Sequence, residues 1–422
     1  MKTNHFLALT GILLTPTLPA LADDWTAWRG GTKQGVSNER NLPLRWSSTR
    51  GIRWQAKPAG WGNASPIIVG SQVFVTSQTD NHDLLVSALR VTDGRSLWAT
   101  KIANGTGTAH QLHNMATPTP VSDGNHVWAL YGTGDLACLD LQGKILWQRN
   151  LQNDYHSYDI MHGMGTSPIL HNGALYIACL HQGPSYLLAI DARTGKQLWK
   201  QDRELGTTGE ARDSYSTPIL FQHRAATYLA ISGGNYVDAY ELRNGSRLWQ
   251  CDGLDVPHPY GRTIAGPTFG ENTIVTVASG FSNRGYTIAL DLDRSDDDDN
   301  PSERWRVKRY SADCPTPVIY NGMVFMIRDD GIASCLDLET GEAHWQERVH
   351  SENVKISPVV ADQRVYFLSG QANCAVVKAA KTFEILERNE LNEETLSAPA
   401  ISNGSIYIRT KTNLYAISSS VN

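Results

Sequence analysis

The sequence lacks several features that would point to other kinds of protein. Its six cysteines include no CxxC motif and no adjacent pair, which argues against zinc-ribbon and thioredoxin-like sites. Lys and Arg together number 37, against 42 Asp and Glu, so we expect no nucleic-acid partner. No stretch after residue 22 approaches the roughly 18 apolar residues of a membrane span, and helical periodicity is absent. We therefore expect an all-β protein without a membrane span.

Residues 1–22 have the composition of a secretory signal peptide. Lys2 precedes an apolar run from Phe6 to Leu14, and the segment ends in Ala20-Leu21-Ala22. A positive residue, a short apolar run and a small-residue site are typical of a cleaved signal. No Cys follows the expected cleavage site, so no lipid anchor is predicted. We expect a soluble periplasmic or secreted monomer.

Two markers alternate along the chain. One is a small residue followed by proline and an apolar run, with eight copies: Ser65-Pro66, Thr117-Pro118, Ser167-Pro168, Thr217-Pro218, Gly266-Pro267, Thr316-Pro317, Ser357-Pro358 and Ala398-Pro399. The other is an apolar run, a turn and a tryptophan, at Trp98, Trp147, Trp199, Trp249, Trp305 and Trp345. A further copy, Thr382 to Glu387, keeps the spacing without Gly or Trp. Repeats of about 40 to 50 residues are typical of propellers.

The copy from Ser167 to Trp199 shows what one repeat contains. Residues 167–170, 174–180 and 186–191 predict three strands, with Asn172-Gly173 as a tight turn between the first two. Thr194-Gly195 supplies a turn residue that accepts positive φ, and residues 197–199 begin a fourth strand. Four antiparallel strands per repeat predict a propeller blade.

The two ends of the chain predict how the ring closes. Only three strands follow the last proline marker, whereas Ile52 to Gln55 place Trp54 where a motif tryptophan belongs. Pairing these segments would leave no unpaired edge. We predict an eight-bladed β-propeller over residues 51–422, closed by this split blade, with residues 23–50 as an N-terminal extension packing on it. The motif tryptophans are expected to lie in the core between blades.

The repeat resembles a known family. The pattern Asp-x-x-Thr-Gly-Lys-x-Leu-Trp, as in Asp191 to Trp199, is similar to the tryptophan docking motif of the quinoprotein propellers. Trp28-Arg29-Gly30, Gly35-Val36-Ser37 and Ile408-Arg409-Thr410 resemble the exported bacterial PQQ-binding-like β-propeller repeat proteins, above all their planctomycete-type group. The chain is also similar to the BamB-like propellers, which are not enzymes. The resemblance implies an exported propeller whose function lies in its loops.

The resemblance also raises the question of a cofactor. Quinoprotein dehydrogenases hold PQQ under a disulfide between adjacent cysteines, with acidic and amide ligands to Ca²⁺. Because the sequence has no such cysteine pair, we predict no cofactor, and PQQ with Ca²⁺ is the disfavoured alternative. Cys138, Cys179 and Cys335 lie in apolar strand patterns, which leaves buried free thiols and disulfides both open.

The long loops between blades carry the candidate site residues. In a propeller these loops meet at one mouth of the central channel, where ligands usually bind. The loops leading into four successive blades are rich in imidazole, phenol and guanidinium groups, which donate hydrogen bonds to carboxylates and sugars. They contain His110, His113 and Asn114, then Tyr155, His156, Tyr158, Asp159 and His162, then Glu210, Arg212, Asp213 and Tyr215, and finally His258, Tyr260 and Arg262. We predict a binding funnel formed by His110, His113, Asn114, Tyr155, His162, Arg212, Tyr215, His258, Tyr260 and Arg262.

Other chemistries have weaker support. His110 and His113 lack a third ligand at a diagnostic spacing, so no metal site is predicted. Asp296 to Asp299 lack the alternating ligands and glycine of a calcium loop and are expected to be a solvated acidic insertion. No nucleophile elbow is present, so no Ser-His-Asp triad can be assigned.

Three functions follow as hypotheses. The first is a non-catalytic exported propeller whose mouth binds a protein partner, a glycan or another polar or acidic small molecule. The second is a polysaccharide lyase-like enzyme, in which a funnel His or Tyr acts as base and an Arg neutralises a uronate. The third is a quinone-dependent dehydrogenase, disfavoured by the missing cysteine pair.

Overall fold

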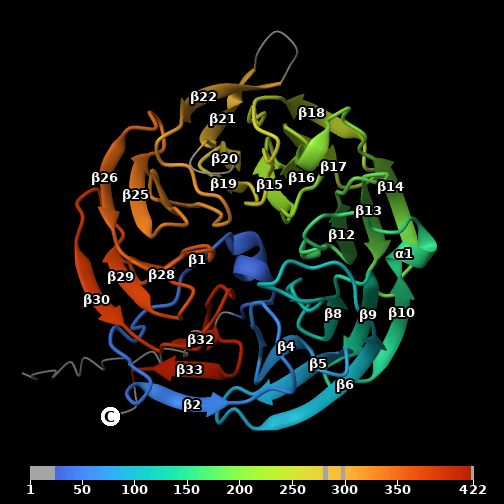
Figure 1. The fold of residues 1–422 in the computed structure, drawn as a ribbon, viewed down its shortest axis with the longest axis vertical. Helices are drawn as coiled ribbons and strands as arrows, with labels where there is room; N and C mark the ends of the chain where they lie inside the picture. The colour runs from blue at the N-terminus through green and yellow to red at the C-terminus, as the bar shows by residue number, and fades with distance from the viewer. Residues whose placement is uncertain (1–23, 279–283, 296–299, 420–422) are drawn as a thin grey trace, which may run out of the picture.

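The fold was analysed in a computed structural model, which describes residues 24–278, 284–295 and 300–419. Its strands form eight sheets arranged around a central channel (Figure 1). The expected signal peptide and the acidic run Asp296 to Asp299 lie outside the described residues. No helix in the described ranges is long and apolar enough to cross a membrane.

Each of the first four blades contains four consecutive antiparallel strands. Blade 1 contains β3 (Ile67–Val69), β4 (Gln72–Gln78), β5 (Asp83–Arg90) and β6 (Ser96–Asn104), and blade 2 contains β7 (Val121–Ser122), β8 (His126–Leu130), β9 (Asp135–Asp140) and β10 (Ile145–Asn150). Blade 3 contains β11 (Ile169–His171), β12 (Ala174–Cys179), β13 (Tyr186–Asp191) and β14 (Gln197–Asp202), and blade 4 contains β15 (Ile219–His223), β16 (Ala226–Gly233), β17 (Tyr236–Glu241) and β18 (Arg247–Cys251). The short helices α1 (Leu151–Asp154) and η2 (Gly209–Arg212) lie in the loops that follow blades 2 and 3.

The other four blades complete the ring. Blade 5 contains β19 (Thr268–Gly270), β20 (Thr273–Ala278), β21 (Tyr286–Ser295) and β22 (Pro301–Val307), and blade 6 contains β23 (Val318–Tyr320), β24 (Met323–Ile327), β25 (Ile332–Asp337) and β26 (Ala343–Arg348). Blade 7 contains β27 (Val359–Ala361), β28 (Arg364–Leu368), β29 (Cys374–Lys378) and β30 (Ile385–Asn389). Blade 8 contains β31 (Ala400–Ser402), β32 (Ser405–Arg409), β33 (Leu414–Ser418) and the N-terminal β2 (Ile52–Ala56). The predicted eight-bladed fold with a split blade is confirmed.

Hydrogen bonds join the two parts of the split blade to each other and join the split blade to blade 1. Strand β2 pairs antiparallel with β33, so that Trp54 lies opposite Ala416. From β32, the buried guanidinium of Arg409 donates hydrogen bonds to Thr76 O at 2.6 Å and to Ser77 Oγ at 2.8 Å, both on β4. These contacts join the last strands of the chain to its first complete blade and leave no open edge at the closure.

The motif tryptophans pack between blades, as their spacing predicts. Trp199 donates its indole N–H to Leu242 O of the next blade at 2.9 Å. Its ring covers Gly245 in that blade's turn, where an added Cβ would lie 2.5 Å from the Trp199 ring. Four other tryptophans cover the next blade's turn glycine in the same way: Trp54 on Gly94, Trp98 on Gly143, Trp147 on Gly195 and Trp305 on Gly341. The turn glycine therefore has two roles. It adopts a positive φ, and its missing side chain leaves room for the preceding blade's tryptophan.

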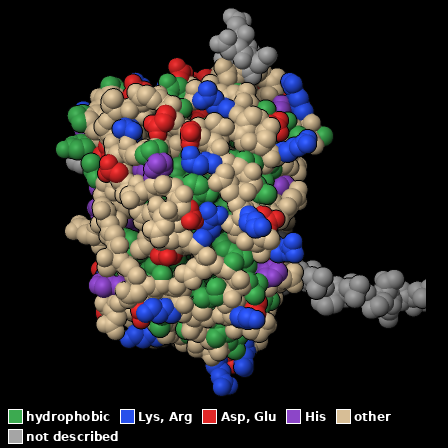
Figure 2. All heavy atoms as spheres, turned by 90° about the vertical axis from the view of Figure 1, so that its right-hand side faces the viewer, with side chains coloured by type: hydrophobic (Ala, Val, Ile, Leu, Met, Phe, Trp, Pro, Cys, Tyr) green, Lys and Arg blue, Asp and Glu red, His purple; other side chains and the backbone are tan. Residues whose placement is uncertain are grey.

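A β-bulge accompanies this motif in every blade. The residue just before the tryptophan position has no partner on the neighbouring strand. In blade 3, Ala189 pairs with Trp199 and Ile190 pairs with Gln197, so that Leu198 is left out of the pairing. The same register shift occurs in the other seven sheets. A bulge bends the strand locally, and in blade 3 the extra side chain, Leu198, is 54% exposed. The side of the ring over blades 2 to 4 shows charged groups of both signs mixed with hydrophobic ones (Figure 2).

The inner strand of each blade begins one residue after a proline marker. In blade 2, β7 begins at Val121, so the equivalent pair is Thr119-Pro120. The sequence assignment of Thr117-Pro118 to this role was therefore wrong by two residues. The cause is the Thr-Pro-Thr-Pro repeat, in which either pair fits the marker and only the start of the strand distinguishes them.

The N-terminal segment, residues 24–37, runs through the central channel (Figure 1). It contains the short 3-10 segment η1 (Trp28–Lys33) and β1 (Val36–Ser37), which pairs parallel to β27 of blade 7. Arg29 donates to Pro317 O of blade 6 at 2.7 Å, and Gln34 donates to Leu220 O of blade 4 at 2.9 Å. The segment thus links blades 4, 6 and 7 from within the channel.

The six cysteines are all free thiols, which decides the alternative that the sequence left open. Five are buried, and only Cys314 is partly exposed.

Candidate functional site

A cavity of about 300 Å³ lies at the channel mouth. Sixteen of its lining residues follow one rule, because every blade contributes the residue just before its marker proline and the residue three before it. The positions just before proline, which we call the inner ring, are Ser65, Thr119, Ser167, Thr217, Gly266, Thr316, Ser357 and Ala398. The positions three before proline, which we call the outer ring, are Asn63, Thr117, Gly165, Tyr215, Ile264, Cys314, Lys355 and Leu396.

The inner ring is held together by hydrogen bonds between neighbouring blades. Five backbone N–H groups each donate to a hydroxyl of the next blade at 2.9 to 3.1 Å: Ser65 to Thr119, Thr119 to Ser167, Ser167 to Thr217, Gly266 to Thr316, and Thr316 to Ser357. Small hydroxyl residues therefore recur here because they satisfy buried backbone donors. The outer-ring residues have only their position before the proline in common, because the eight of them belong to eight different types.

Trp28 closes the cavity from below. It belongs to the N-terminal segment and lines both the mouth cavity and a second cavity deeper in the channel. The second cavity is bordered by residues that follow the inner-ring residue of their blade by one to three positions, among them Val121, Ile169 and Ile219. The mouth is thus a blind pocket with an indole in its floor.

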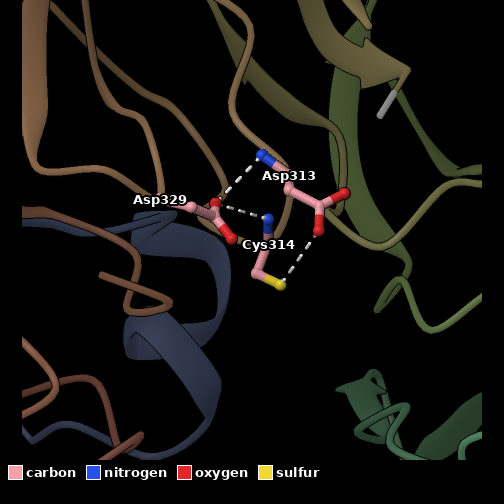
Figure 3. Close-up of side chains that lie close together, drawn as sticks. All are labelled: Asp313, Cys314 and Asp329. Atoms are coloured by element: carbon pink, nitrogen blue, oxygen red, sulfur yellow. Dashed lines mark hydrogen bonds between the residues drawn. The ribbon is translucent and has the colours of Figure 1, made fainter. Parts of the chain in front are cut away.

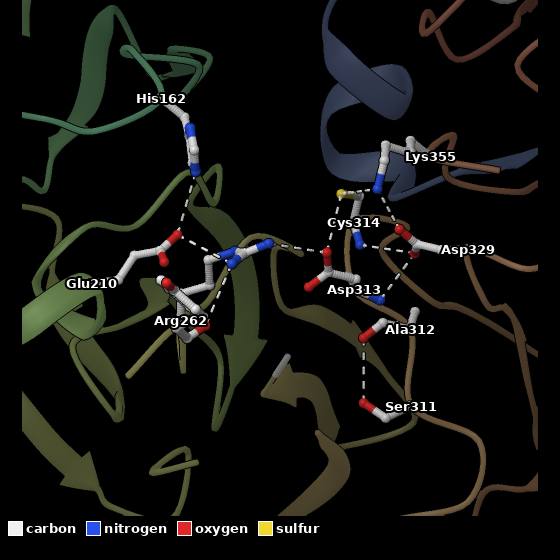
Figure 4. Close-up of polar contacts among 10 residues, drawn as sticks. His162, Glu210, Arg262, Ser311, Ala312, Asp313, Cys314, Asp329 and Lys355 are labelled. Carbon is white, nitrogen blue, oxygen red and sulfur yellow. Dashed lines mark hydrogen bonds and ion pairs between the residues drawn. The ribbon is translucent and has the colours of Figure 1, made fainter. Parts of the chain in front are cut away.

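A chain of polar contacts crosses one side of the mouth (Figure 4). Arg262 lies at its centre, with Nη1 3.1 Å from Glu210 Oε1 and Nη2 3.3 Å from Asp313 Oδ2. His162 Nε2 lies 3.5 Å from the same Glu210 oxygen. On the other side of Asp313, its backbone N–H donates to Asp329 Oδ1 at 3.2 Å, and Asp329 forms an ion pair with Lys355. Five interblade loops and the β24–β25 turn are joined in this way.

The cluster of Asp313, Cys314 and Asp329 has the residue types of a metal site (Figure 3). However, the Lys355 ammonium contacts Asp329 and lies 3.5 Å from Cys314 Sγ. Burial raises the pKa of the Cys314 thiol, which therefore stays protonated at neutral pH. A lysine cation already balances this cluster, so it offers poor ligands to a metal ion.

Burial also shifts the charges of the other mouth residues. It lowers the pKa of His110, His113 and His162, so these imidazoles are mostly neutral at pH 7. It raises the pKa of Glu210 even though the Arg262 guanidinium acts in the opposite direction. It raises the pKa of Tyr215 as well, with a further contribution from Asp213.

The three histidines form a compact group beside this chain. The rings of His110 and His162 meet edge to face with centroids 5.2 Å apart, and His110 stacks on His113 at 6.4 Å. Both nitrogens of His113 are already engaged: Nε2 accepts from His110 N–H at 3.3 Å, and Nδ1 lies 3.2 Å from Thr117 Oγ1. This leaves His113 without a free nitrogen for a metal.

Five of the ten predicted funnel residues line the mouth cavity: His110, His113, His162, Tyr215 and Arg262. The structure places the other five elsewhere. Asn114 is buried behind the wall, where it donates to Trp61 O at 2.8 Å. Tyr155 donates to Gln197 on the outer strand of blade 3. Arg212 lies 3.7 Å from Glu204, and His258 lies in a separate depression, with its ring 5.4 Å from that of the exposed Tyr260.

Sequence reasoning missed Asp313, Cys314, Lys355 and Trp28 as lining residues. The predicted funnel included only the histidine-rich loops, the last of which leads into blade 5. The outer-ring rule would have found Cys314 and Lys355, because both stand three residues before a marker proline. Trp28 had no such signal, since its segment enters the channel from outside the repeats.

An eight-bladed ring of tryptophan-docked blades, with a blind cavity at its mouth, defines a PQQ-type β-propeller. The chain belongs to the family described as outer membrane protein assembly factor BamB, whose profile matches residues 30–202 and, in an overlapping second match, 85–347.

Comparisons with individual proteins agree with this assignment. The chain is 21% identical over 331 residues to outer membrane protein assembly factor BamB of Yersinia pestis, covering 74% of this chain and 75% of that one. It is 28% identical over 174 residues to quinohemoprotein alcohol dehydrogenase ADH-IIG of Pseudomonas putida, covering 40% of this chain and 23% of that enzyme. With BamB of Moranella endobia it shares 29% over 200 residues, which is 47% of this chain and 44% of the relative. The chain thus spans less than half the length of the last two.

Solved structures show the same fold at low sequence identity. BamB from Moraxella catarrhalis superposes with a TM-score of 0.62 at 12% identity, covering 87% of this chain and 98% of that one. Quinohemoprotein alcohol dehydrogenase from Comamonas testosteroni gives 0.64 at 12% identity, covering 93% and 80%. The fold is therefore common to proteins named as assembly factors and to proteins named as dehydrogenases, and by itself it does not distinguish between them.

The mouth residues do not fit the quinone site that the resemblance implies. The sequence has no adjacent cysteines, and all six thiols are free. Among the described residues that line the cavity, Asp313 is the one acid, and it is paired with Arg262.

Proposed function

We propose that this protein is an exported, non-catalytic propeller that binds a small polyhydroxylated molecule, such as a sugar, at its channel mouth. The supporting observation is a blind cavity of about 300 Å³ to which all eight blades contribute, with Trp28 in the floor. Concave sites with a few converging polar groups are the usual form of a small-molecule site.

The charge distribution favours hydroxyl groups over carboxylates as the ligand. The two strong cations of the wall, Arg262 and Lys355, are already paired with Glu210, Asp313 and Asp329. A carboxylate ligand would have to compete with these acids. A hydroxyl both donates and accepts, so it can bond to an acid, a neutral imidazole or a threonine without displacing an ion pair.

Binding to purified protein tests this proposal. We expect a neutral oligosaccharide from a glycan array to bind the natural protein, and we expect the triple variant His113→Gln, His162→Gln and Arg262→Gln to lose at least about tenfold in affinity, because about 1.4 kcal/mol corresponds to tenfold. A matched triple variant, Tyr155→Phe, Arg212→Gln and His258→Gln, changes funnel residues that lie away from the cavity and should bind normally. Equal binding by both triple variants would refute the mouth as the site.

A partner protein docked over the mouth is the second candidate. Three large hydrophobic side chains are exposed in the interblade loops around the cavity: Leu112 at 43%, Met161 at 52% and Tyr260 at 51%. Large apolar side chains exposed on one face of a protein are typical of a protein interface. Because Leu112 lines the cavity and the other two do not, the test replaces only Met161 and Tyr260 by Ser, which should weaken partner capture but leave sugar binding unchanged.

The two enzymatic hypotheses have less support. A raised pKa makes Tyr215 a poor base at neutral pH. Incubation with acidic polysaccharides should therefore yield no new unsaturated ends, and addition of PQQ with Ca²⁺ should yield no dye reduction. Either product would replace the binding proposal by the corresponding enzyme.

A further inference from the structure

The outer rim of blades 1 to 4 carries a regular series of exposed leucines. The residue that the bulge leaves unpaired before the motif tryptophan is, in these four blades, Leu97, Leu146, Leu198 and Leu248. Their side chains are 39%, 46%, 54% and 42% exposed. They are four of the seven large hydrophobic side chains that are exposed among the described residues, and the other three lie in the loops around the mouth.

The remaining blades do not continue this series. The equivalent residues are Arg304 in blade 5, His344 in blade 6 and Arg53 in blade 8. Blade 7 has Leu386 at this position, but that side chain is partly buried against the core. The exposed leucines are thus confined to four consecutive blades on one side of the ring (Figure 1).

The same four blades carry an excess of cations. We call the stretch from the last residue of the third strand to the end of the outer strand the rim segment of a blade. In blades 1 to 4 the rim segments, residues 90–104, 140–150, 191–202 and 241–251, contain ten Lys and Arg against five Asp and Glu. In blades 6 and 7 they are residues 337–348 and 378–389 and contain four Lys and Arg against six Asp and Glu. Lys and Arg lie beside hydrophobic side chains on the side of the ring that Figure 2 shows.

Most of the cations in these four segments are available to a partner. Four of the ten form ion pairs, with Asp93, Asp83, Asp154 and Asp202. The other six are exposed and form no ion pair with a described carboxylate: Arg95, Lys144, Arg193, Lys196, Arg243 and Arg247. Each of the six precedes the leucine of its blade by one to five positions, so charge and apolar surface are close together.

The four rim segments form one continuous surface, because each outer strand contacts the turn of the next blade. Thr100 Oγ1 donates to Gly143 O at 2.7 Å, and Arg149 Nη1 donates to Gly195 O at 2.6 Å. The indole contact of Trp199 with the blade 4 turn continues this series. The basic turn of one blade therefore adjoins the outer strand that carries the leucine of the blade before it.

The combination of leucines and cations restricts the chemistry of the partner. An acidic polysaccharide would match the cations but not the leucines, and an apolar partner would leave six cations unmatched. A second copy of the chain fits poorly, because pairing leucines with leucines would also place cations against cations. The opposite rim, with Arg304, His344 and Arg53 at the leucine position, offers no apolar match.

We propose that the rim of blades 1 to 4 docks on an anionic lipid surface. The leucines enter the headgroup region, and the exposed cations contact the lipid phosphates. Because the ring is convex, a lipid surface contacts neighbouring blades rather than all four, and Leu146 and Leu198, the two most exposed leucines, contribute most. This site lies on the rim and does not depend on the function proposed for the mouth.

Flotation of the purified protein with lipid vesicles tests the proposal. Vesicles of equal parts phosphatidylglycerol and phosphatidylcholine should carry the natural protein upward in a density gradient, and vesicles of phosphatidylcholine alone should not. High salt should release the protein, because the Debye length falls from about 10 Å at 0.1 M to about 3 Å at 1 M.

A leucine pair tests the apolar part of the rim. The double variant Leu146→Ser and Leu198→Ser should bind the anionic vesicles at least about tenfold more weakly, because two apolar side chains no longer leave water. The matched control, Met161→Ser with Tyr260→Ser, removes two exposed apolar side chains near the mouth and should float like the natural protein.

A lysine pair tests the charge. The double variant Lys144→Gln and Lys196→Gln should also bind at least about tenfold more weakly, since each cation near an anionic surface contributes several-fold. Lys378→Gln with Lys381→Gln makes the same change in net charge on blade 7, where both side chains are exposed, and should float normally. The lysine pair and the salt dependence keep the test decisive if the leucine pair does not fold.

Three results would overturn the proposal. The first is no flotation with the anionic vesicles, which is also the result expected if the rim binds an acidic protein instead. The second is equal flotation with phosphatidylcholine alone. The third is flotation of folded leucine and lysine variants to the same extent as the natural protein.

Discussion

The interblade tryptophan contacts and the channel mouth both recur from blade to blade, but the first repeat residue types and the second repeats positions. Between blades the residue types recur, with a tryptophan on the turn glycine of the next blade in five of the described contacts. At the mouth the outer ring repeats only a position and places eight different residue types there. A blade thus fixes the geometry of the mouth through its scaffold residues and leaves the chemistry of the mouth free to vary.

The largest effect is expected from removing a scaffold tryptophan. Trp199 is 8% exposed and donates to Leu242 O. Trp199→Ala should lower the free energy of unfolding by about 3–5 kcal/mol, as for other buried aromatic residues. Chemical denaturation measures this, with Leu198→Ala as the control, since that outward side chain should cost under about 0.5 kcal/mol. Equal losses from the two changes would contradict the assigned roles.

The turn glycine should follow. Gly245 has a φ of 74°, and an added Cβ would lie 2.5 Å from Trp199. Gly245→Ala should cost about 2 kcal/mol, partly from the left-handed backbone and partly from the clash. Gly173→Ala is the matched control, because it has a φ of 76° but nothing within 4 Å of the new Cβ. In the Trp199→Ala background the extra cost at Gly245 should disappear, and additive losses would argue against the contact.

Substitutions in the inner and outer rings of the mouth should differ less in their effect on the free energy of unfolding. Thr217→Val removes the hydroxyl that accepts the Ser167 N–H at 3.1 Å and should cost about 1–2 kcal/mol, because a buried donor is left unpaired. Ile264→Thr, in the outer ring, should cost under about 1 kcal/mol because the side chain is half-buried. A costlier outer-ring change would remove the distinction between the rings.

The smallest effect is a pH dependence. Burial lowers the pKa of His110, His113 and His162 in the folded protein, so below about pH 6.5 the unfolded chain binds more protons. The free energy of unfolding should therefore fall between pH 7.5 and 5.5, by under about 1 kcal/mol for each histidine. The triple His→Gln variant should show a smaller fall. Measurements stay above pH 5.5 because the raised pKa values of Glu210 and Asp329 act in the opposite direction at lower pH.

Much of the fold could be predicted from the sequence because each blade repeats the same local signals. Trp54 and the three last strands were enough to predict closure, and β2 pairs with β33 as expected. The Thr117-Pro118 assignment failed where two copies of the marker overlap. The two pairs are then equivalent in sequence, and the start of β7 decides between them.

The site could be predicted only in part. His162 and Arg262 were found because they lie in long polar loops, but Arg212 and His258 lie in the same loops and face elsewhere. Composition does not indicate which side of a loop a residue faces. The position relative to the marker proline does so for Tyr215, Cys314 and Lys355, because each stands at the same distance before the inner strand of its blade.

The N-terminal segment has a consequence for the order of folding. The four strands of each of blades 1 to 7 pair with near neighbours in sequence, but Arg29 contacts Pro317 across 288 residues and Gln34 contacts Leu220 across 186. Contacts of such high order form slowly, because a long loop must close before they contribute. Trp25 and Thr26 bond to Ile68 of blade 1 and Ser122 of blade 2, but the partners of residues 29–37 do not exist until the fourth, sixth and seventh blades have formed. We therefore expect residues 29–37 to be among the last to reach their final positions, so that the centre of the channel is filled only after most of the ring has assembled.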